Sequence, residues 1–216
     1  MMKMRLLALL LLAGCVSKPV PPSWQTNAHD AIGAFTDAYL SGDTRVADAE
    51  FGRARLAASS TGRADEVAQV ELVRCAAQAA SLVFESCPGF AALAADATAA
   101  QNAYAAYLDG RWQGLKPELL PEQHAAVVRG GQIAEVKDPL ARLVAAGAAF
   151  KAQRLAPEGI NVAVDAASGQ GWRRPLLTWL GVAAKRAEAV GDAAQLDRIR
   201  RRIALASTEP LPAAHK

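Results

Sequence analysis

The sequence predicts an all-α protein of antiparallel helical hairpins, arranged as a bundle or a short solenoid of about eight helices. Hydrophobic residues make up 52% of the 216 residues but aromatic residues only 6%. Much of the apolar content is therefore alanine, the strongest helix former. Apolar side chains recur at spacings of three and four, and no segment sustains a period of two. Short glycine- and proline-containing connections favour antiparallel packing of neighbouring helices.

The individual helices follow from this periodicity and from the residues that interrupt it. The expected helices are Ala28–Ser41, Thr44–Ser59, Arg63–Leu82, Pro88–Leu108, Glu122–Val128, Pro139–Gln153, Pro157–Ser168, Arg174–Val190 and Asp192–Leu205. Three residues that disfavour helix, Gly114, Pro117 and Pro121, predict a loop with a short turn between the fourth and fifth helices. Together these segments predict one helical domain over residues 27–208, followed by a frayed tail over 209–216.

The N-terminus has the pattern of a secretory signal. Lys3 and Arg5 precede an apolar run from Leu6 to Ala13, which is too short to span a bilayer stably. The run ends in Leu12-Ala13-Gly14-Cys15, which resembles the lipobox of bacterial lipoproteins. The alternative is an ordinary signal peptide that happens to contain a cysteine.

The lipobox resemblance implies that residues 1–14 are a signal peptide and that Cys15 is diacylated on its thiol. Cys15 then becomes the first residue and carries three acyl groups, which anchor the chain stably to a membrane. Val16 stands where inner-membrane lipoproteins often carry Asp, so the resemblance implies the outer membrane, with the protein on its periplasmic face. Residues 15–26, proline-rich over Ser17–Ser23, are expected to act as a spacer.

The charge balance excludes one class of partner. Removal of Lys3 and Arg5 with the signal lowers the formal net charge from +3 to +1. A nearly neutral chain gives no reason to expect a nucleic-acid partner.

The two remaining cysteines, Cys75 and Cys87, predict a structural disulfide in an oxidising periplasm. A helix continuing to Phe84 would carry the chain too far from Cys75 for the return to bring the two Cα atoms within bonding reach. The bond therefore requires the helix to end early, or Ser86–Phe90 to fold back over it. A redox-active pair is disfavoured because the Cys-x-x-Cys spacing is absent, and a zinc site because no histidine is nearby.

A short internal repeat links two distant segments. Ala38–Asp43 is echoed by Ala106–Arg111 at an offset of 68 residues, which is twice the tetratricopeptide period. Four residues resemble the turn and second helix of a tetratricopeptide unit: Gly42, Ala47, Phe51 and Ala54. The first helix of that unit departs from the pattern, so the alternative is an alanine-rich bundle that matches a degenerate motif by chance.

No sequence motif indicates catalysis, a metal site or a cofactor, and none is expected. His29 and His215 are expected in solvent, and His124 lies two residues from Glu122, so these two side chains do not share a helix face. Four carboxylates near these segments look like scattered surface charge: Asp96, Asp109, Glu118 and Glu122.

The triplet Trp172, Arg173 and Arg174 is a candidate partner-binding site, because Trp and Arg are enriched at binding hot spots. The alternative is a packing role at a helix start, with Pro175 in the first turn. The basic run Arg198, Arg200, Arg201 and Arg202 is expected on a solvated helix face.

These observations favour a non-catalytic outer-membrane lipoprotein that serves as a periplasmic protein-interaction or envelope-assembly module, with an envelope protein as its partner. One alternative is a cell-wall-acting enzyme whose site is assembled from distant carboxylates. The other is a purely structural envelope component. A concave groove lined by exposed aromatic and arginine side chains would favour the first function. A deep pocket with two carboxylates, or a Glu with a His, would favour the enzyme.

Overall fold

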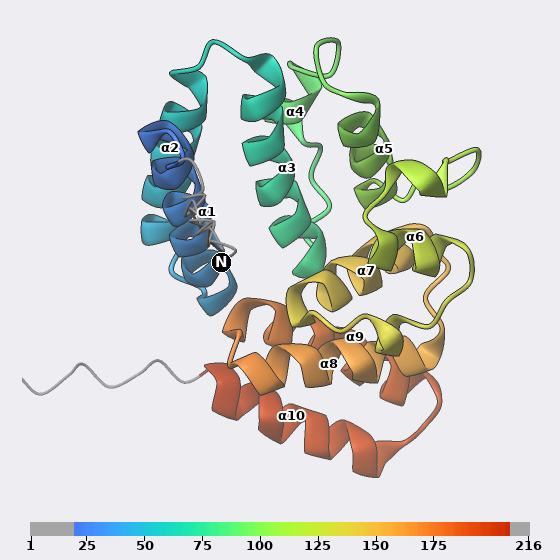
Figure 1. Ribbon diagram of the computed structural model, residues 1–216. Helices are drawn as coiled ribbons and strands as arrows, with labels where there is room; N and C mark the ends of the chain where they lie inside the picture. The colour runs from blue at the N-terminus through green and yellow to red at the C-terminus, as the bar shows by residue number, and fades with distance from the viewer. Residues whose placement is uncertain (1–19, 208–216) are drawn as a thin grey trace, which may run out of the picture.

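The computed structural model describes residues 20–207, and within that range the protein is all-α (Figure 1). The predicted fold class is therefore confirmed, and no strand occurs among the described residues. The α-helices are α1 (Ser23–Ser41), α2 (Thr44–Ser59), α3 (Ala64–Ala80), α4 (Pro88–Ala91), α5 (Ala99–Leu108), α6 (Glu122–Val128), α7 (Pro139–Lys151), α8 (Pro157–Gln170), α9 (Arg173–Ala189) and α10 (Ala193–Ser207). Two short 3₁₀ turns, η1 (Pro117–Leu119) and η2 (Ile133–Glu135), flank α6.

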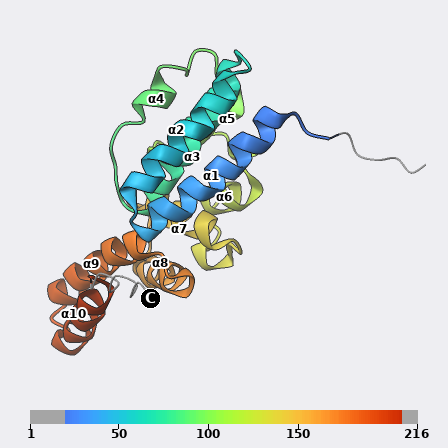
Figure 2. The same ribbon diagram turned by 90° about the vertical axis from the view of Figure 1, so that its left-hand side faces the viewer.

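The helices are arranged as hairpins around the central helix α3. The α1–α2 hairpin lies along one side of α3, while α7 crosses its C-terminal end and leads into α8, α9 and α10 (Figure 1). The start of α1 and the α9–α10 hairpin lie at opposite ends of the molecule (Figure 2).

Two hydrophobic clusters hold the helices together, and α3 contributes to both. The larger cluster runs from α3 through α10 and contains the fully buried Tyr107 and Trp179. The smaller cluster packs Phe35 and Phe51 of the α1–α2 hairpin against α3. The Trp179 indole Nε1 donates a hydrogen bond to the Ala80 carbonyl at 3.0 Å, which satisfies an end of α3 that has no further helical partner.

Gly147 sets the crossing of α3 and α7. A Cβ atom at this position would overlap the Ala79 carbonyl oxygen, so the two backbones meet with no side chain between them. Five of the six residues from Leu143 to Ala148 are 0% exposed or nearly so, with alanine at 145, 146 and 148. The alanine content thus produces close helix packing rather than a large aromatic core.

The expected single helix Pro88–Leu108 is wrong. The chain leaves α4 at Ala91 and forms turns, and α5 starts only after Thr98. The Thr98 hydroxyl accepts the Gln101 backbone N–H, while the Gln101 side chain accepts the Thr98 N–H. This reciprocal capping box starts a new helix where alanine content alone predicts continuation.

Several other boundaries differ from expectation. Helix α1 begins at Ser23, within the expected spacer, and α3 ends at Ala80 rather than Leu82. Leu82 then adopts a left-handed conformation with φ 57°, which turns the chain. The expected signal peptide, Cys15 and the tail over 209–216 lie outside the described residues.

The internal repeat corresponds to a recurring helix C-cap. Asp43 N–H bonds to the Ala38 carbonyl at 2.9 Å, and Arg111 N–H bonds to the Ala106 carbonyl at 3.0 Å. In both copies the intervening glycine has positive φ, 97° at Gly42 and 73° at Gly110. This is the Schellman arrangement, in which glycine occupies the left-handed position without a Cβ clash. The same bond pattern closes α3, α6, α7, α8 and α9.

Candidate functional site

The structure brings Cys75 and Cys87 to disulfide distance, with their Cα atoms 6.0 Å apart. A disulfide between these residues requires the helix that carries Cys75 to end early. Helix α3 does so at Ala80, and the chain then turns back along it. Cys87 is the N-cap residue of the short helix α4. The prediction of this pair is confirmed, and the pair ties α4 to the C-terminal half of α3.

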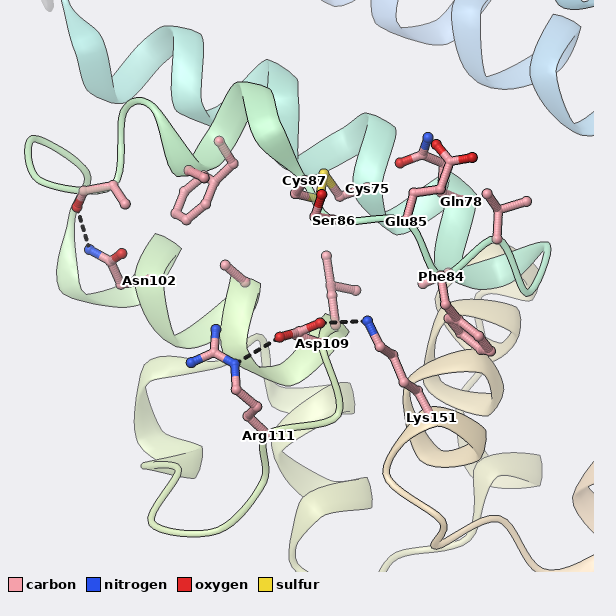
Figure 3. Close-up of a pocket in the computed structure, with 17 residues that line it drawn as sticks. Cys75, Gln78, Phe84, Glu85, Ser86, Cys87, Asn102, Asp109, Arg111 and Lys151 are labelled. Atoms are coloured by element: carbon pink, nitrogen blue, oxygen red, sulfur yellow. Dashed lines mark hydrogen bonds and ion pairs between the residues drawn. A yellow bond between two sulfur atoms is a disulfide. The ribbon is translucent and has the colours of Figure 1, made fainter.

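A groove of about 460 Å³ lies beside this pair, and we call it the disulfide groove (Figure 3). Its walls are the α3 face around Cys75, the irregular segment Val83–Cys87, helices α4 and α5, and Lys151 at the end of α7. Buried apolar side chains, among them Phe90 and Leu108, form its base. The groove is therefore apolar within and polar at its rim.

Asp109 is the centre of a small ionic cluster on the rim (Figure 3). Its carboxylate accepts hydrogen bonds from Lys151 Nζ at 2.5 Å and from Arg111 Nε at 2.8 Å. Burial alone raises the pKa of Asp109, but the hydrogen bonds and positive charges of Lys151 and Arg111 outweigh burial and lower it. The charged Asp109 carboxylate thus connects the C-terminal end of α7 to the C-terminal end of α5.

Two stacked aromatic rings lie beside this cluster. Phe84 and Phe150 have ring centroids 6.2 Å apart and nearly parallel planes, and each side chain is 37% exposed. Lys151 Nζ lies 5.5 Å from the Phe84 ring centroid, within cation–π range. Phe150 also packs edge-on against buried Trp179 at 5.9 Å, so the exposed pair is fixed to the core. Aromatic side chains, Phe included, are enriched at protein–protein interfaces, so this exposed and fixed pair is a candidate contact surface.

The segment between α3 and α4 presents free main-chain groups at the same groove. Within residues 20–207, the backbone N–H groups of Phe84, Glu85 and Ser86 have no hydrogen-bond partner. Both Glu85 and Ser86 are exposed and line the groove. Consecutive unpaired main-chain groups can pair with the backbone of an extended peptide.

A buried carboxylate supports the wall formed by α4. Glu71 of α3 is 2% exposed and accepts hydrogen bonds from Arg55 Nε and Arg74 Nη2, both at 2.9 Å. Gly89 of α4 lies so close to this carboxylate that a Cβ there would overlap it. Glu71 therefore joins α2, α3 and α4, and a side chain at position 89 would displace its carboxylate.

The candidate triplet Trp172, Arg173 and Arg174 lies at the start of α9, away from the disulfide groove. Arg174 Nε donates to the Tyr39 carbonyl at 2.6 Å, and Nη2 donates to Thr44 Oγ1 at 2.8 Å. Trp172 is half-buried against the larger cluster. The binding role of this triplet stays a prediction, but the Arg174 guanidinium is already bonded within the chain.

Sequence reasoning missed the rim residues of the disulfide groove. Asp109 looks like scattered surface charge in the sequence, and Phe84, Phe150 and Lys151 carry no motif. The one available signal was the requirement that the chain fold back before Cys87, which places Phe84 and Glu85 at the surface of the turn. Nothing local in the sequence indicates that α7 ends beside that turn.

No helix between residues 20 and 207 is both long and apolar enough to cross a membrane. No three His, Cys, Asp or Glu side chains in that range are grouped so that they could hold a metal ion.

Comparisons with protein-family models, curated proteins and solved structures give no match to this chain.

Proposed function

We propose that the protein is an outer-membrane lipoprotein, anchored through Cys15, whose periplasmic domain binds an envelope protein at the disulfide groove. The lipobox resemblance at Leu12–Cys15 supports the anchor. The placement of Cys75 and Cys87 at disulfide distance fits an oxidising compartment. A tethered module of this kind raises the local concentration of its partner without further contacts.

The observation that carries the binding role is the coincidence of three features in and beside one groove, which Phe84 lines and Phe150 adjoins. An apolar base of about 460 Å³ accepts side chains, the Phe84–Phe150 stack and Lys151 supply a candidate contact surface, and the free backbone of 84–86 supplies main-chain pairing. A partner segment that would fit the disulfide groove is an extended peptide that inserts one apolar side chain into the apolar base. Its backbone would run along Phe84–Ser86.

Anchoring is tested by Cys15→Ser. The unchanged chain should incorporate palmitate and fractionate with the outer membrane, whereas the variant should do neither. Equal membrane fractionation and equal gel mobility of the two forms would overturn the lipoprotein proposal.

Binding is tested by site-specific photocrosslinking in envelope fractions. A benzoylphenylalanine at position 84 should form one discrete adduct, and the same probe at Leu56 should form none. Leu56 is a matched control because it is apolar and 73% exposed but lies on α2, outside the groove. Adducts of equal yield from both positions would indicate collision rather than a site, and would overturn the proposed docking surface.

A second variant, Phe150→Ser, tests the contribution of the aromatic pair in the same crosslinking experiment. Phe150→Ser removes half of the aromatic pair, and we expect it to reduce the adduct from position 84 at least about tenfold, as hot-spot residues do. Because Phe150 also contacts Trp179, the thermal melting of this variant must be compared with that of the unchanged chain.

A further inference from the structure

A second groove, of about 540 Å³, lies on a different face of α3. We call it the histidine groove. Helix α7 supplies Leu140, Ala141 and Val144 to one wall. The α3 wall consists of residues at helical spacing: Gln69, Leu72, Val73, Ala76 and Ala77. Helices α1, α5 and α6, the last residue of η1 and the two residues after it complete the groove. The volume is within the range of pockets that hold small molecules, and the walls are mainly aliphatic.

Two aromatic side chains with polar groups line the same cavity. His124 is 3% exposed, and its Nδ1 lies 3.1 Å from the Tyr107 hydroxyl. Its other ring nitrogen has no hydrogen-bond partner among residues 20–207, and neither does the Tyr104 hydroxyl. The Tyr104 and His124 rings have centroids 5.6 Å apart. Neither atom is fully enclosed, because among residues 20–207 only Ser81 Oγ is a buried side-chain polar atom without a partner. Both atoms can therefore bond to water in the groove, or to a ligand that replaces this water.

The charge of the lining limits what can bind. Among the described residues, 20–207, no Lys or Arg lines the histidine groove, and Asp138 is the one lining residue with a formal charge. The Asp138 carboxylate accepts the Ala141 N–H at 2.7 Å and caps α7. Burial lowers the pKa of His124 to about 4, partly offset by the charge of Asp138, so the imidazole is neutral at pH 7. Nothing in the lining can neutralise a carboxylate or a phosphate.

We propose that the histidine groove binds an uncharged single-chain amphiphile. The aliphatic chain lies between α3 and α7, and an uncharged head with hydroxyl or ester oxygens meets His124 and Tyr104. A fatty acid or phospholipid would bring an anion next to Asp138 without a cation to pair it, which disfavours these ligands. This site is separate from the disulfide groove and does not rest on the binding role proposed there.

The test is calorimetric titration of the purified full chain at pH 7 with three ligands of one chain length. Monodecanoylglycerol should bind at least about tenfold more tightly than decanoate, because only the latter carries an unpaired charge into the groove. Decyl phosphate should behave like decanoate. Equal or tighter binding of either anion, or no binding of monodecanoylglycerol, would overturn the proposal.

Two variants locate the binding within the groove. Ala100→Trp places a large ring at an exposed position that lines the groove, and should abolish monodecanoylglycerol binding. Ala34→Trp is the matched control, because Ala34 is an exposed helical alanine of α1 that does not line it. Binding by Ala100→Trp as tight as by Ala34→Trp would overturn the proposed position.

Tyr104→Phe provides a test that does not depend on the folding of Ala100→Trp. It keeps the ring and its contact with His124 but removes the hydroxyl. We expect affinity for monodecanoylglycerol to fall roughly three- to tenfold, the effect of one lost hydrogen bond. Unchanged affinity would contradict the placement of the head group at Tyr104.

Discussion

His124 shows how burial changes the chemistry of a single residue. Its ring is enclosed by Tyr104 and Tyr107, with ring centroids 5.6 and 5.0 Å away, and it is held neutral because burial lowers its pKa to about 4. The unfolded chain should protonate the same imidazole near its ordinary value of 6.5. Between these two values the unfolded state binds more protons than the folded state, so stability falls as the pH falls.

We therefore predict that titration of His124 lowers the free energy of unfolding by about 2.5 kcal/mol when the pH falls from 8 to 4.5. Urea unfolding at both pH values, for the unchanged chain and for His124→Leu, isolates this contribution from that of the carboxylates. Between pH 8 and pH 4.5, the free energy of unfolding of the variant should fall by about 2.5 kcal/mol less than that of the unchanged chain. Equal losses in both proteins would show that His124 titrates normally in the folded state.

At the scale of elements, the Cys75–Cys87 disulfide links α3 to α4, and a reductant can break this link. Replacing Cys75 and Cys87 together by Ala should lower the unfolding free energy by about 3 kcal/mol in the chain-entropy description of a short closed loop. Urea unfolding measures the loss, and the unchanged chain treated with a reductant should match the variant. Titration of two free thiols in the unreduced, unfolded protein would contradict the bond.

The crossing of α3 and α7 makes a second prediction at this scale. Gly147→Ala should destabilise the protein by more than about 2 kcal/mol, because the added Cβ meets the Ala79 carbonyl, which is backbone and must move. Gly181→Ala is the matched control, since Gly181 is inside α9 and a Cβ there meets nothing within 4 Å. Thermal melting should show that this control is unchanged or stabilised by up to about 1 kcal/mol. Similar melting of both variants would contradict a glycine-dependent crossing.

The elements also show what the sequence could and could not predict. Apolar periodicity located most helices, and glycine located their ends, because both signals are local. The Thr98–Gln101 capping box was equally local, yet the alanine-rich pattern around it predicted an uninterrupted helix. Leu82 and Gln153 were not predictable as turn residues, because both adopt positive φ, 57° in each case, without being glycine. The rim of the disulfide groove joins residues 84, 109 and 151, and such long-range proximity leaves no trace in a single sequence.

At the scale of the whole molecule, the α1–α2 hairpin is held by the smaller cluster, which it shares with α3, and by contacts with α9. The larger cluster contains no residue of α1 or α2. Arg174 is therefore a main polar link between the hairpin and the C-terminal helices, bonding to Tyr39 and Thr44 across more than a hundred residues of sequence. Its guanidinium also lies 4.3 Å from the Tyr39 ring centroid.

This arrangement predicts that Arg174→Ala loosens the hairpin selectively. Loss of two charge-assisted hydrogen bonds and a cation–π contact should lower the local opening free energy of α1 and α2 by about 1 to 3 kcal/mol. Hydrogen–deuterium exchange should therefore accelerate in α1 and α2 and stay unchanged in α10. Arg201→Ala, on the exposed face of α10, is the control and should change neither region. If Arg174→Ala exchanged like the unchanged chain but lost a crosslinked partner, the guanidinium would serve binding, as the sequence first suggested, rather than the joining of the two ends of the molecule.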